Sequence, residues 1–360
     1  MKNILLIFPL MACVGCNQQQ SNTDSCALLD SLGISVSATE NREYSYTDKK
    51  SGYWYGTTHQ DSTFFWSGWN IAKKRILSDY QLGVDQDFLN RKEAACIVYP
   101  HKLVRNWKQA QETFYLVDDR PVLYIGMDQV EGDSIAIRLN QDLLQGGLMQ
   151  DEGIAYGLAE DSGHQILLAP AKDCDFRGMK EGIKVPASAQ GFLITFGTPE
   201  ENKKLLSEFR KNGKQWLNER ALRMTRLLTE FNPVSTNLKE LDHALNWLTL
   251  TTDELVTEQQ GKGIYAGLPW FNEYWGRDMF ISMPGTCLVS GQFDIAKQIL
   301  MDFAKLQDKN PESPTYGRIP NRANLEGILY NTTDGTPRFV IQAFELLEYS
   351  GDTAFIRDIY

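Results

Sequence analysis

The stretch of sequence with the most evident chemistry is residues 263–278, GIYAGLPWFNEYWGRD, which interleaves aromatic rings with polar side chains. A core helix of this composition would bury its charges, and a surface loop would expose a large apolar area. Aromatic faces stack on the C–H faces of a sugar ring, and carboxylates and guanidinium groups hydrogen-bond its hydroxyls. The stretch therefore predicts a pocket for a neutral, hydroxylated ligand, with aromatic packing between two helices as the alternative. Its candidate ligand-binding residues are Trp270, Phe271, Glu273, Trp275, Arg277 and Asp278.

A second group of hydrogen-bonding residues lies further along the chain, in the segments GRIPN and YNTTD. Asn321, Tyr330 and Asp334 belong to a long loop that we expect at the same end of the molecule as Trp275–Asp278. Ordinary turn chemistry is the alternative, because Asn and Asp are common in loops. Taken by themselves, the residues nominate Asp278 and Asp334 as a pair of carboxylates.

Composition excludes several other classes of function. The 360-residue chain carries a net charge of −10, which argues against nucleic-acid binding and against an anionic membrane surface. It has no glycine-rich phosphate loop of the Walker or Rossmann type, its four histidines are isolated, and no zinc-ligand spacing is present. We therefore predict no cofactor and no metal.

The N-terminus has the pattern of a bacterial lipoprotein signal. Residues 1–16 contain a charged start, a short apolar run and small residues before a cysteine, so Cys13 or Cys16 is the expected lipidation site. This predicts an extracytoplasmic protein, in the periplasm or at the cell surface, held to the membrane through a lipid anchor only. Polar residues then predominate over 17–43, which we predict to be a flexible tether.

Residues 44–197 read as a β-sandwich domain. The runs 112–117 and 121–127 flank a turn and predict a hairpin, and 134–140 alternates apolar and polar residues. The aromatic-rich segment Gly52–Trp69 either packs inside this sandwich or lines a pocket shared with the later domain.

Helices are expected after the sandwich. Thr198 and Glu201 form a capping box with Pro199 at the first helical position, which predicts a linking helix over 198–232. From residue 233 to 360 the pattern predicts helical hairpins joined by alternating short and long loops, a toroid whose long loops form the binding face. The helices expected are about 237–255, capped by Asn237, then 278–290, a third over 295–306, a fourth from 336 to 350, and a fifth after Asp352.

The spacing of apolar residues predicts which helix faces are buried. The expected inward residues are Leu238, Leu241, Leu245, Leu248 and Leu255 in the first helix, and Val340, Ala343, Phe344 and Leu347 in the fourth. Phe355, Ile356 and Ile359 form an apolar face that we expect to find uncovered. This predicts either a fragment of a longer protein or a surface covered by a partner.

The motifs WFNEYWGRDMFISMPG, IPN and YNTTDGTPRF, in this order, resemble the C-terminal catalytic domain of glycogen debranching enzymes, the amylo-α-1,6-glucosidases. The segments GYWYG and WSGWNIAKKRI are similar to the N-terminal sandwich of bacterial relatives. The resemblance implies a multidomain β + α protein in which an N-terminal β-sandwich precedes an (α/α)6 barrel. Residues 233–360 would then supply only the first helices of that barrel.

The resemblance also implies a function, the hydrolysis of α-1,6-linked glucose at the branch points of an α-glucan or a branched oligosaccharide. By match, Trp275, Arg277 and Asp278 would hold the sugar at the cleavage subsite, and Asn321, Tyr330 and Asp334 would add to it. The family's catalytic acid and base would follow Tyr360, so this chain by itself is expected to be an inactive fragment. We expect Arg277 to keep the neighbouring Asp278 ionised, as suits an acceptor of sugar hydroxyl protons.

Two other functions remain open at this stage. A related (α/α)6 glucosidase of trehalase-like or oligosaccharide-glucosidase type would share the architecture with another linkage preference. A non-catalytic glucan-binding lipoprotein would keep the sugar-holding wall without hydrolysis.

Overall fold

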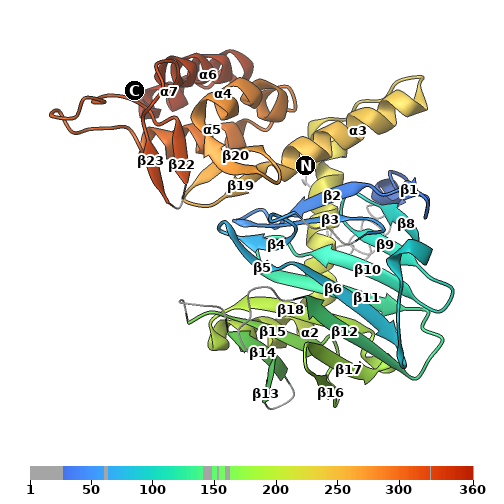
Figure 1. Ribbon diagram of the computed structural model, residues 1–360. Helices are drawn as coiled ribbons and strands as arrows, with labels where there is room; N and C mark the ends of the chain where they lie inside the picture. Colours follow the sequence, from blue (N-terminus) through green and yellow to red (C-terminus); the bar gives the residue numbers. More distant parts are fainter. Residues whose placement is uncertain are drawn as a thin grey trace, which may run out of the picture.

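The structure, a computed structural model, is a β-rich N-terminal region joined by one long helix to a C-terminal region of helices and a small sheet (Figure 1). Within the described residues, no helix is both long and apolar enough to cross a membrane. The predicted lipoprotein signal, with Cys13 and Cys16, lies outside the described residues. Those are residues 27–60, 64–140, 148–151, 154–158, 163–324 and 326–359.

Three antiparallel sheets make up the N-terminal region. The largest has the order β1-β8-β9-β10-β11-β18-β15-β14-β13, and the others have the orders β16-β17-β12-β6-β7 and β2-β3-β4-β5. The strands of the first are β1 Ile34–Val36, β8 Ala95–Val98, β9 Leu103–Asn106, β10 Gln111–Leu116, β11 Val122–Asp128, β13 Met149–Asp151, β14 Ile154–Leu158, β15 Gln165–Pro170 and β18 Gly191–Gly197. The other two contain β2 Glu43–Thr47, β3 Gly52–Thr57, β4 Gly68–Ile71, β5 Lys74–Leu77, β6 Asp79–Val84, β7 Asp87–Phe88, β12 Ser134–Asn140, β16 Arg177–Met179 and β17 Gly182–Pro186.

The sheets share one hydrophobic core, as a sandwich requires. Phe114 of β10 is fully buried and lies within 6.5 Å, centroid to centroid, of rings from β2, β3 and β6. The predicted hairpin is confirmed by the antiparallel pairing of β10 with β11, and the alternating run 134–140 is confirmed as β12. Trp54 and Trp69 of the segment Gly52–Trp69 pack inside this core.

The prediction of a flexible tether over 17–43 is wrong for the part that the structure describes. β1 pairs with β8, and Leu29 and Leu32 are buried against α2 and α3. The Nε1 of Trp247 donates a hydrogen bond of 2.8 Å to the carbonyl of Leu32. The short apolar patch with Leu29 and Leu32 attaches this polar segment to the fold, because its side chains pack against α2 and α3.

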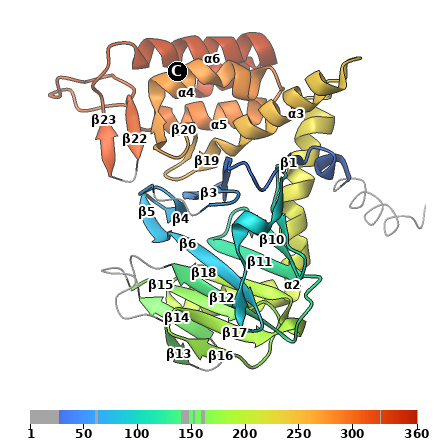
Figure 2. The same ribbon diagram turned by 45° about the vertical axis from the view of Figure 1, so that its right-hand side comes forward.

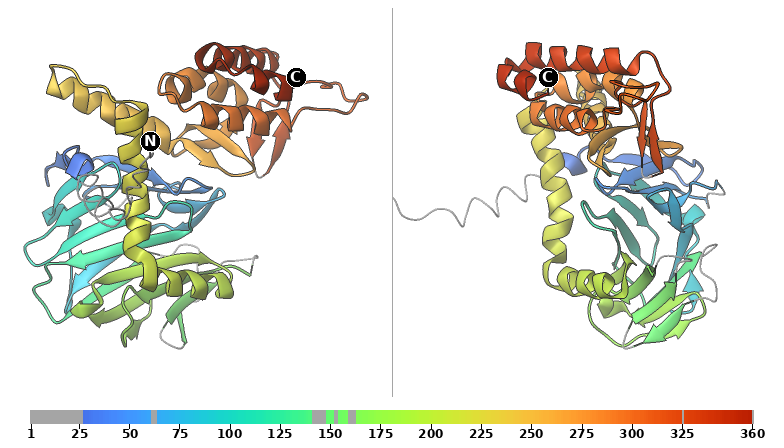
Figure 3. Two further views of the ribbon diagram at one scale, coloured as in Figure 1. Left: turned by 180° about the vertical axis from the view of Figure 1, so that it is seen from behind. Right: turned by 90° about the vertical axis from the view of Figure 1, so that its left-hand side faces the viewer.

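The linking helix begins where the capping box predicted. α2 spans Pro199–Arg226, with Thr198 and Glu201 hydrogen-bonded reciprocally, and a π-helical turn Leu227–Phe231 continues it to Asn232. Leu206, Phe209 and Trp216 pack on β15, β18 and their neighbours. Figure 3 shows the helix running along the β-rich region to the C-terminal region.

The C-terminal region contains the helices that the sequence predicted. They are α3 Lys239–Glu254, α4 Gly276–Met283 with a π-helical turn Pro284–Leu288, α5 Phe293–Ala304, α6 Gly335–Ser350 and α7 Thr353–Ile359. α3 begins after Leu238, without the predicted side-chain cap from Asn237. Whether these helices belong to an (α/α)6 barrel stays a prediction.

The expectation that only helices and loops follow residue 233 is wrong. A five-stranded sheet of order β19-β20-β21-β22-β23 occupies both predicted long loops (Figures 1 and 2). Its strands are β19 Val256–Glu258, β20 Lys262–Gly267, β21 Phe271–Trp275, β22 Arg322–Asn324 and β23 Gly327–Leu329. Most of the first predicted site stretch is therefore a hairpin, which fixes the direction of each side chain.

Several predicted helix faces are also wrong. Leu238, Leu241 and Leu248 of the first helix are exposed, as are Val340 and Phe344 of α6. The α6 residues that face the core are Phe339, Ala343 and Leu346. The face of α7 that we expected to be uncovered, with Phe355, Ile356 and Ile359, packs instead into the core shared with α5 and α6.

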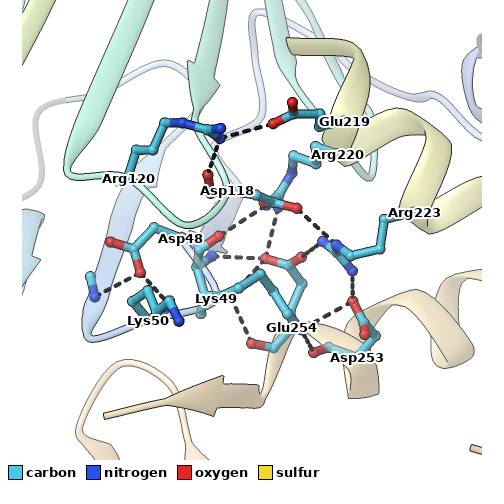
Figure 4. A network of polar contacts seen from close by, with 12 residues as sticks. Asp48, Lys49, Lys50, Asp118, Arg120, Glu219, Arg220, Arg223, Asp253 and Glu254 are labelled. Atoms are coloured by element: carbon cyan, nitrogen blue, oxygen red, sulfur yellow. Dashed lines mark hydrogen bonds and ion pairs between the residues drawn. The ribbon is translucent and has the colours of Figure 1, made fainter. Parts of the chain in front are cut away.

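A network of buried charges holds the two regions together (Figure 4). Asp118, at the β10–β11 turn, accepts hydrogen bonds from Arg220 Nη1 at 2.5 Å and Arg223 Nε at 2.8 Å. At the end of α3, Glu254 pairs with Arg220 Nη2 at 2.8 Å and accepts from the backbone N–H of Thr47 at 2.7 Å. Because β19 follows directly, this network sets the position of the small sheet against the β-rich region.

Candidate functional site

Strand β21 divides the predicted site stretch between two faces. Tyr274 turns into the core, where its ring lies 5.8 Å from that of Tyr265 and its hydroxyl contacts Thr257 at 2.9 Å. Since side chains alternate along a strand, Glu273 and Trp275 share the opposite face. The register between β20 and β21 shifts between Tyr274 and Phe271, so this alternation does not extend to Phe271. Tyr265 and Tyr274 therefore pack the core while Phe271 is exposed, and the predicted pocket for a hydroxylated ligand stays a prediction.

Trp270 and Phe271 lie at the start of β21, and both rings are exposed. Trp270 makes an edge contact with Trp66 of the β-rich region, with ring centroids 5.8 Å apart. The packing alternative for the second aromatic segment, Gly52–Trp69, is confirmed for its strands, whereas a pocket shared with the later domain stays a prediction. The strand residues of this segment pack the sandwich, and its end reaches the C-terminal region.

Glu273 is buried at the centre of a charged cluster between the two regions. Lys73, at the turn between β4 and β5, pairs with its carboxylate, and Asn324 Nδ2 donates to Oε1 at 2.9 Å. Arg322 Nη1 lies 4.0 Å from Oε2. The carboxylate is therefore held by the protein's own groups, and Lys73 and Arg322 are residues that the site prediction had missed.

The end of β21 brings together buried polar atoms that have no partner within the described residues. They are Trp275 Nε1, Asn321 Oδ1 and Thr332 Oγ1. The backbone connects them, since the Gly276 N–H donates to the carbonyl of Asn321 at 2.6 Å, and the Asn321 Nδ2 donates to Asn331 Oδ1 at 3.1 Å. A buried polar atom without a partner costs about 1–3 kcal/mol, so these groups need water or a hydroxylated ligand to satisfy them.

Gly276 of the WGRD motif has a clear local role. A Cβ at this position would lie 2.5 Å from the carbonyl oxygen of Pro320. Only glycine allows the start of α4 to approach the segment 320–321 so closely, and this approach places Trp275 and Asn321 side by side.

Arg277 and Asp334 form an ion pair between the N-terminal ends of α4 and α6. Arg277 Nη2 donates to Asp334 Oδ1 at 2.9 Å, and Nε lies 2.9 Å from Oδ2. Hydrogen bonding to Arg277 lowers the pKa of Asp334, and the same bond raises the pKa of Arg277. The expected pairing of Arg277 with its neighbour Asp278 is replaced by this contact. Asp278 is exposed and makes no hydrogen bond or ion pair with the described part of the chain.

Tyr330 lies further from this group than its motif suggested. Its hydroxyl donates to the carbonyl of Leu306 at 2.7 Å, after the C-terminal end of α5, and burial raises its pKa. The side chain thus anchors the loop to α5. Among the described residues, no group of His, Cys, Asp and Glu side chains is arranged to hold a metal ion.

The structure therefore gathers part of the predicted site. Trp275, Asn321, Arg277 and Asp334 surround the beginnings of α4 and α6, whereas Trp270 and Phe271 lie at the other end of β21. Thr332 was missed because its motif reads as loop sequence. Its position between Asn331 and Asp334 was the available signal.

Comparison with known proteins concerns the C-terminal region. Residues 237–360 match the family model described as Amylo-alpha-1,6-glucosidase. This segment, about a third of the chain, is therefore similar to the amylo-alpha-1,6-glucosidase family. Every residue of the predicted substrate-binding set lies inside the segment that matches this family, as do β19–β23 and α3–α7.

A relative of this amylo-alpha-1,6-glucosidase segment is the glycogen debranching enzyme of Saccharomyces cerevisiae. It is 30% identical over 126 residues, which cover 31% of this chain. The match spans only 8% of the yeast enzyme's length.

Proposed function

We propose that the protein is a glycoside hydrolase of α-glucans and that the region around Trp275 holds the α-1,6-linked glucose of a branch point. The observation that carries this proposal is the group of unpartnered buried atoms, Trp275 Nε1, Asn321 Oδ1 and Thr332 Oγ1. Together they offer one donor, one acceptor and one hydroxyl beside an aromatic ring, a set that suits the hydroxyls and C–H faces of a sugar.

The charged groups support a binding role for this region. Because Asp334 is paired with Arg277, its pKa is lowered, so it stays ionised and cannot protonate a leaving oxygen near neutral pH. Inverting hydrolysis needs a carboxylic acid on one side of the bond and a carboxylate base for water on the other. We assign neither role to Asp334, and we propose that Asp278, exposed at the same helix end, accepts hydrogen bonds from sugar hydroxyls.

Thr332 gives the sharpest test, because its hydroxyl has no structural partner in the described part of the chain. Thr332→Val keeps the shape and removes the hydroxyl. We expect unchanged or slightly raised thermal stability, together with about fivefold to tenfold weaker binding of maltotriose that carries one α-1,6-linked glucose, since a hydrogen bond contributes about 1 kcal/mol. Calorimetric titration measures the affinity.

Thr229→Val is the matched control, since Thr229 is exposed on the π-helical turn after α2 and bonds only to the carbonyl of Thr225. It should bind the branched ligand like the parent chain. Equal binding by Thr332→Val and the parent would remove the support for a sugar site here. Titrations with trehalose and maltose would reveal a trehalase-like or other linkage preference.

We also propose that the protein is a lipoprotein anchored through Cys13 or Cys16, on the basis of the signal pattern in residues 1–16. Metabolic labelling with palmitate should mark the parent chain, and replacing the lipidated cysteine by alanine should abolish the label. Equal labelling of both single variants would contradict a single anchor site.

A further inference from the structure

We propose that the exposed aromatic residues where the two regions meet bind the glucan chain on which the branch is carried. These residues are Phe64, Phe65, Trp66, Trp270 and Phe271, called here the aromatic platform. The inference rests on the proposed function and extends it, because it assigns to the β-rich region a part in choosing substrates by chain length.

Four rings of the platform, those of Phe64, Phe65, Trp66 and Trp270, contact one another around the partly buried Trp66, and Phe271 follows Trp270 directly in the chain. Phe64 stacks on Trp66 with centroids 5.1 Å apart, and Phe65 meets the same ring edge-on at 4.5 Å. Trp66 in turn contacts Trp270. The exposed fractions are 47% for Phe64, 76% for Phe65, 58% for Trp270 and 52% for Phe271. A contiguous exposed group of large rings marks an interaction surface, since isolated apolar residues do not gather in this way.

Hydrogen bonds hold the Phe64–Trp66 segment in place. Asn70 Nδ2 donates to the Trp66 carbonyl at 2.9 Å, and Arg75 Nη1 donates to the Phe65 carbonyl at 3.2 Å. The rings are therefore presented by a backbone that strands β4 and β5 fix. A surface ordered before binding loses less entropy when a ligand arrives.

The platform continues into the proposed branch-point site along β21. Trp270 and Phe271 lie at the start of this strand, and Trp275 lies at its end. Between them lie the polar groups of Lys73, Glu273 and Arg322. A ligand that runs along β21 would meet aromatic rings near both ends of the strand and hydrogen-bonding groups between them, which suits a chain of several sugar units.

This arrangement favours a glucan over a protein partner. The rings of the platform can stack on the C–H faces of sugar units, and the polar residues Lys73, Glu273 and Arg322 lie along β21 toward the proposed sugar site. A second copy of the chain, docked through the same rings, is the other outcome that the experiment must separate.

The test compares two ligands that differ only in chain length, maltotriose and maltoheptaose, each carrying one α-1,6-linked glucose. Calorimetric titration of the full chain should show tighter binding of the longer ligand. Phe65→Ala should weaken binding of the longer ligand by about threefold to tenfold, as expected for loss of one ring contact, with little change for the shorter one. The control is Phe344→Ala on α6, whose ring is 56% exposed outside the platform, and it should leave both affinities unchanged.

The outcomes separate this inference from the proposed function. If Phe65→Ala binds both ligands like the parent chain, the platform has no part in binding, while the proposed sugar site stands. If the parent chain binds neither ligand, the proposed function fails and the inference fails with it. If light scattering shows that Phe65→Ala dissociates a dimer without changing either affinity, the platform is a contact between copies and the inference is overturned.

Discussion

Asp48 provides a quantitative prediction about the interface between the two regions (Figure 4). It lies in the β2–β3 turn and is 3% exposed, and its Oδ1 accepts hydrogen bonds from the backbone N–H groups of Lys50 at 2.8 Å and Gly52 at 2.9 Å. Burial raises the pKa of this carboxyl to about 7, against the effect of the two amides, and the charges of Asp118 and Asp119 raise it further. The folded protein therefore favours neutral Asp48.

The sign of the effect on stability follows from this shift. Below pH 3.8 the carboxyl is protonated in both the folded and the unfolded chain, so its contribution to folding is fully present there. As the pH rises from about 4 to about 7, Asp48 ionises in the unfolded chain while it stays neutral in the folded one. Ionisation therefore favours the unfolded chain, and the contribution of Asp48 to folding is lost. Because folding raises the pKa from 3.8 to about 7, the free energy of unfolding is lower by about 4 kcal/mol above pH 7 than below pH 3.8.

The substitution Asp48→Asn tests this reasoning, because asparagine has the shape of the neutral acid and keeps the acceptor for both amides. We expect the parent chain and the variant to unfold at similar urea concentrations at pH 4. At pH 8 the variant should be more stable by about 2–4 kcal/mol. Urea unfolding followed by tryptophan fluorescence measures both values.

Asp118→Asn is the matched control in the same network. Burial alone would raise the pKa of Asp118, but the charges of Arg223 and Arg220 outweigh it and lower the pKa to about 2. This variant should therefore lose about 2 kcal/mol at pH 8, in the opposite direction to Asp48→Asn. If Asp48→Asn is no more stable than the parent chain at pH 8, the assignment of a buried neutral acid is refuted.

Two further substitutions test the geometry of the site. Gly276→Ala should lower the free energy of unfolding by about 1–3 kcal/mol and weaken sugar binding, because its Cβ would meet the Pro320 carbonyl. Gly285→Ala is the control, because its Cβ would meet nothing within 4 Å, and it should change neither stability nor sugar binding. If both variants lost the same stability, the close approach of Gly276 to Pro320 would be contradicted. Lys73→Met should cost about 1–3 kcal/mol because it leaves Glu273 buried without its cation, and adding Glu273→Gln should recover part of the loss in thermal unfolding.

Local signals predicted much of the fold. The capping box at Thr198, the alternation over 134–140 and the helix end at Gly351, which adopts a left-handed φ of 69°, each depend on a few neighbouring residues. Such interactions are encoded within one turn or one strand, so the sequence alone locates them well.

Features that depend on distant partners could not be predicted. Hydrophobic spacing marks one face of α3 but cannot say which elements cover it, and Leu238 and Leu248 are exposed in the structure. In the small sheet, the pairing of β21 with β22 was missed because it joins residues about 50 apart, as Tyr274 and Ala323 show. The hairpin of β20 and β21 is local, but an irregularity in its register breaks the alternation that marks a regular strand pair. The partner of Arg277 was missed for the same reason, since Asp334 follows it by 57 residues.

The missed sheet changes how the aromatic stretch should be interpreted. In a loop, all its rings could face one pocket, whereas in β21 alternation sends Tyr274 inward and leaves Glu273 and Trp275 on the other face. Lys73 contacts this second face from the β-rich region. The sugar-holding surface that we propose therefore belongs to neither region alone. A change in the charge network at Asp118, Arg220 and Glu254, which sets how the two regions meet, should alter binding along β21 without any contact to the ligand.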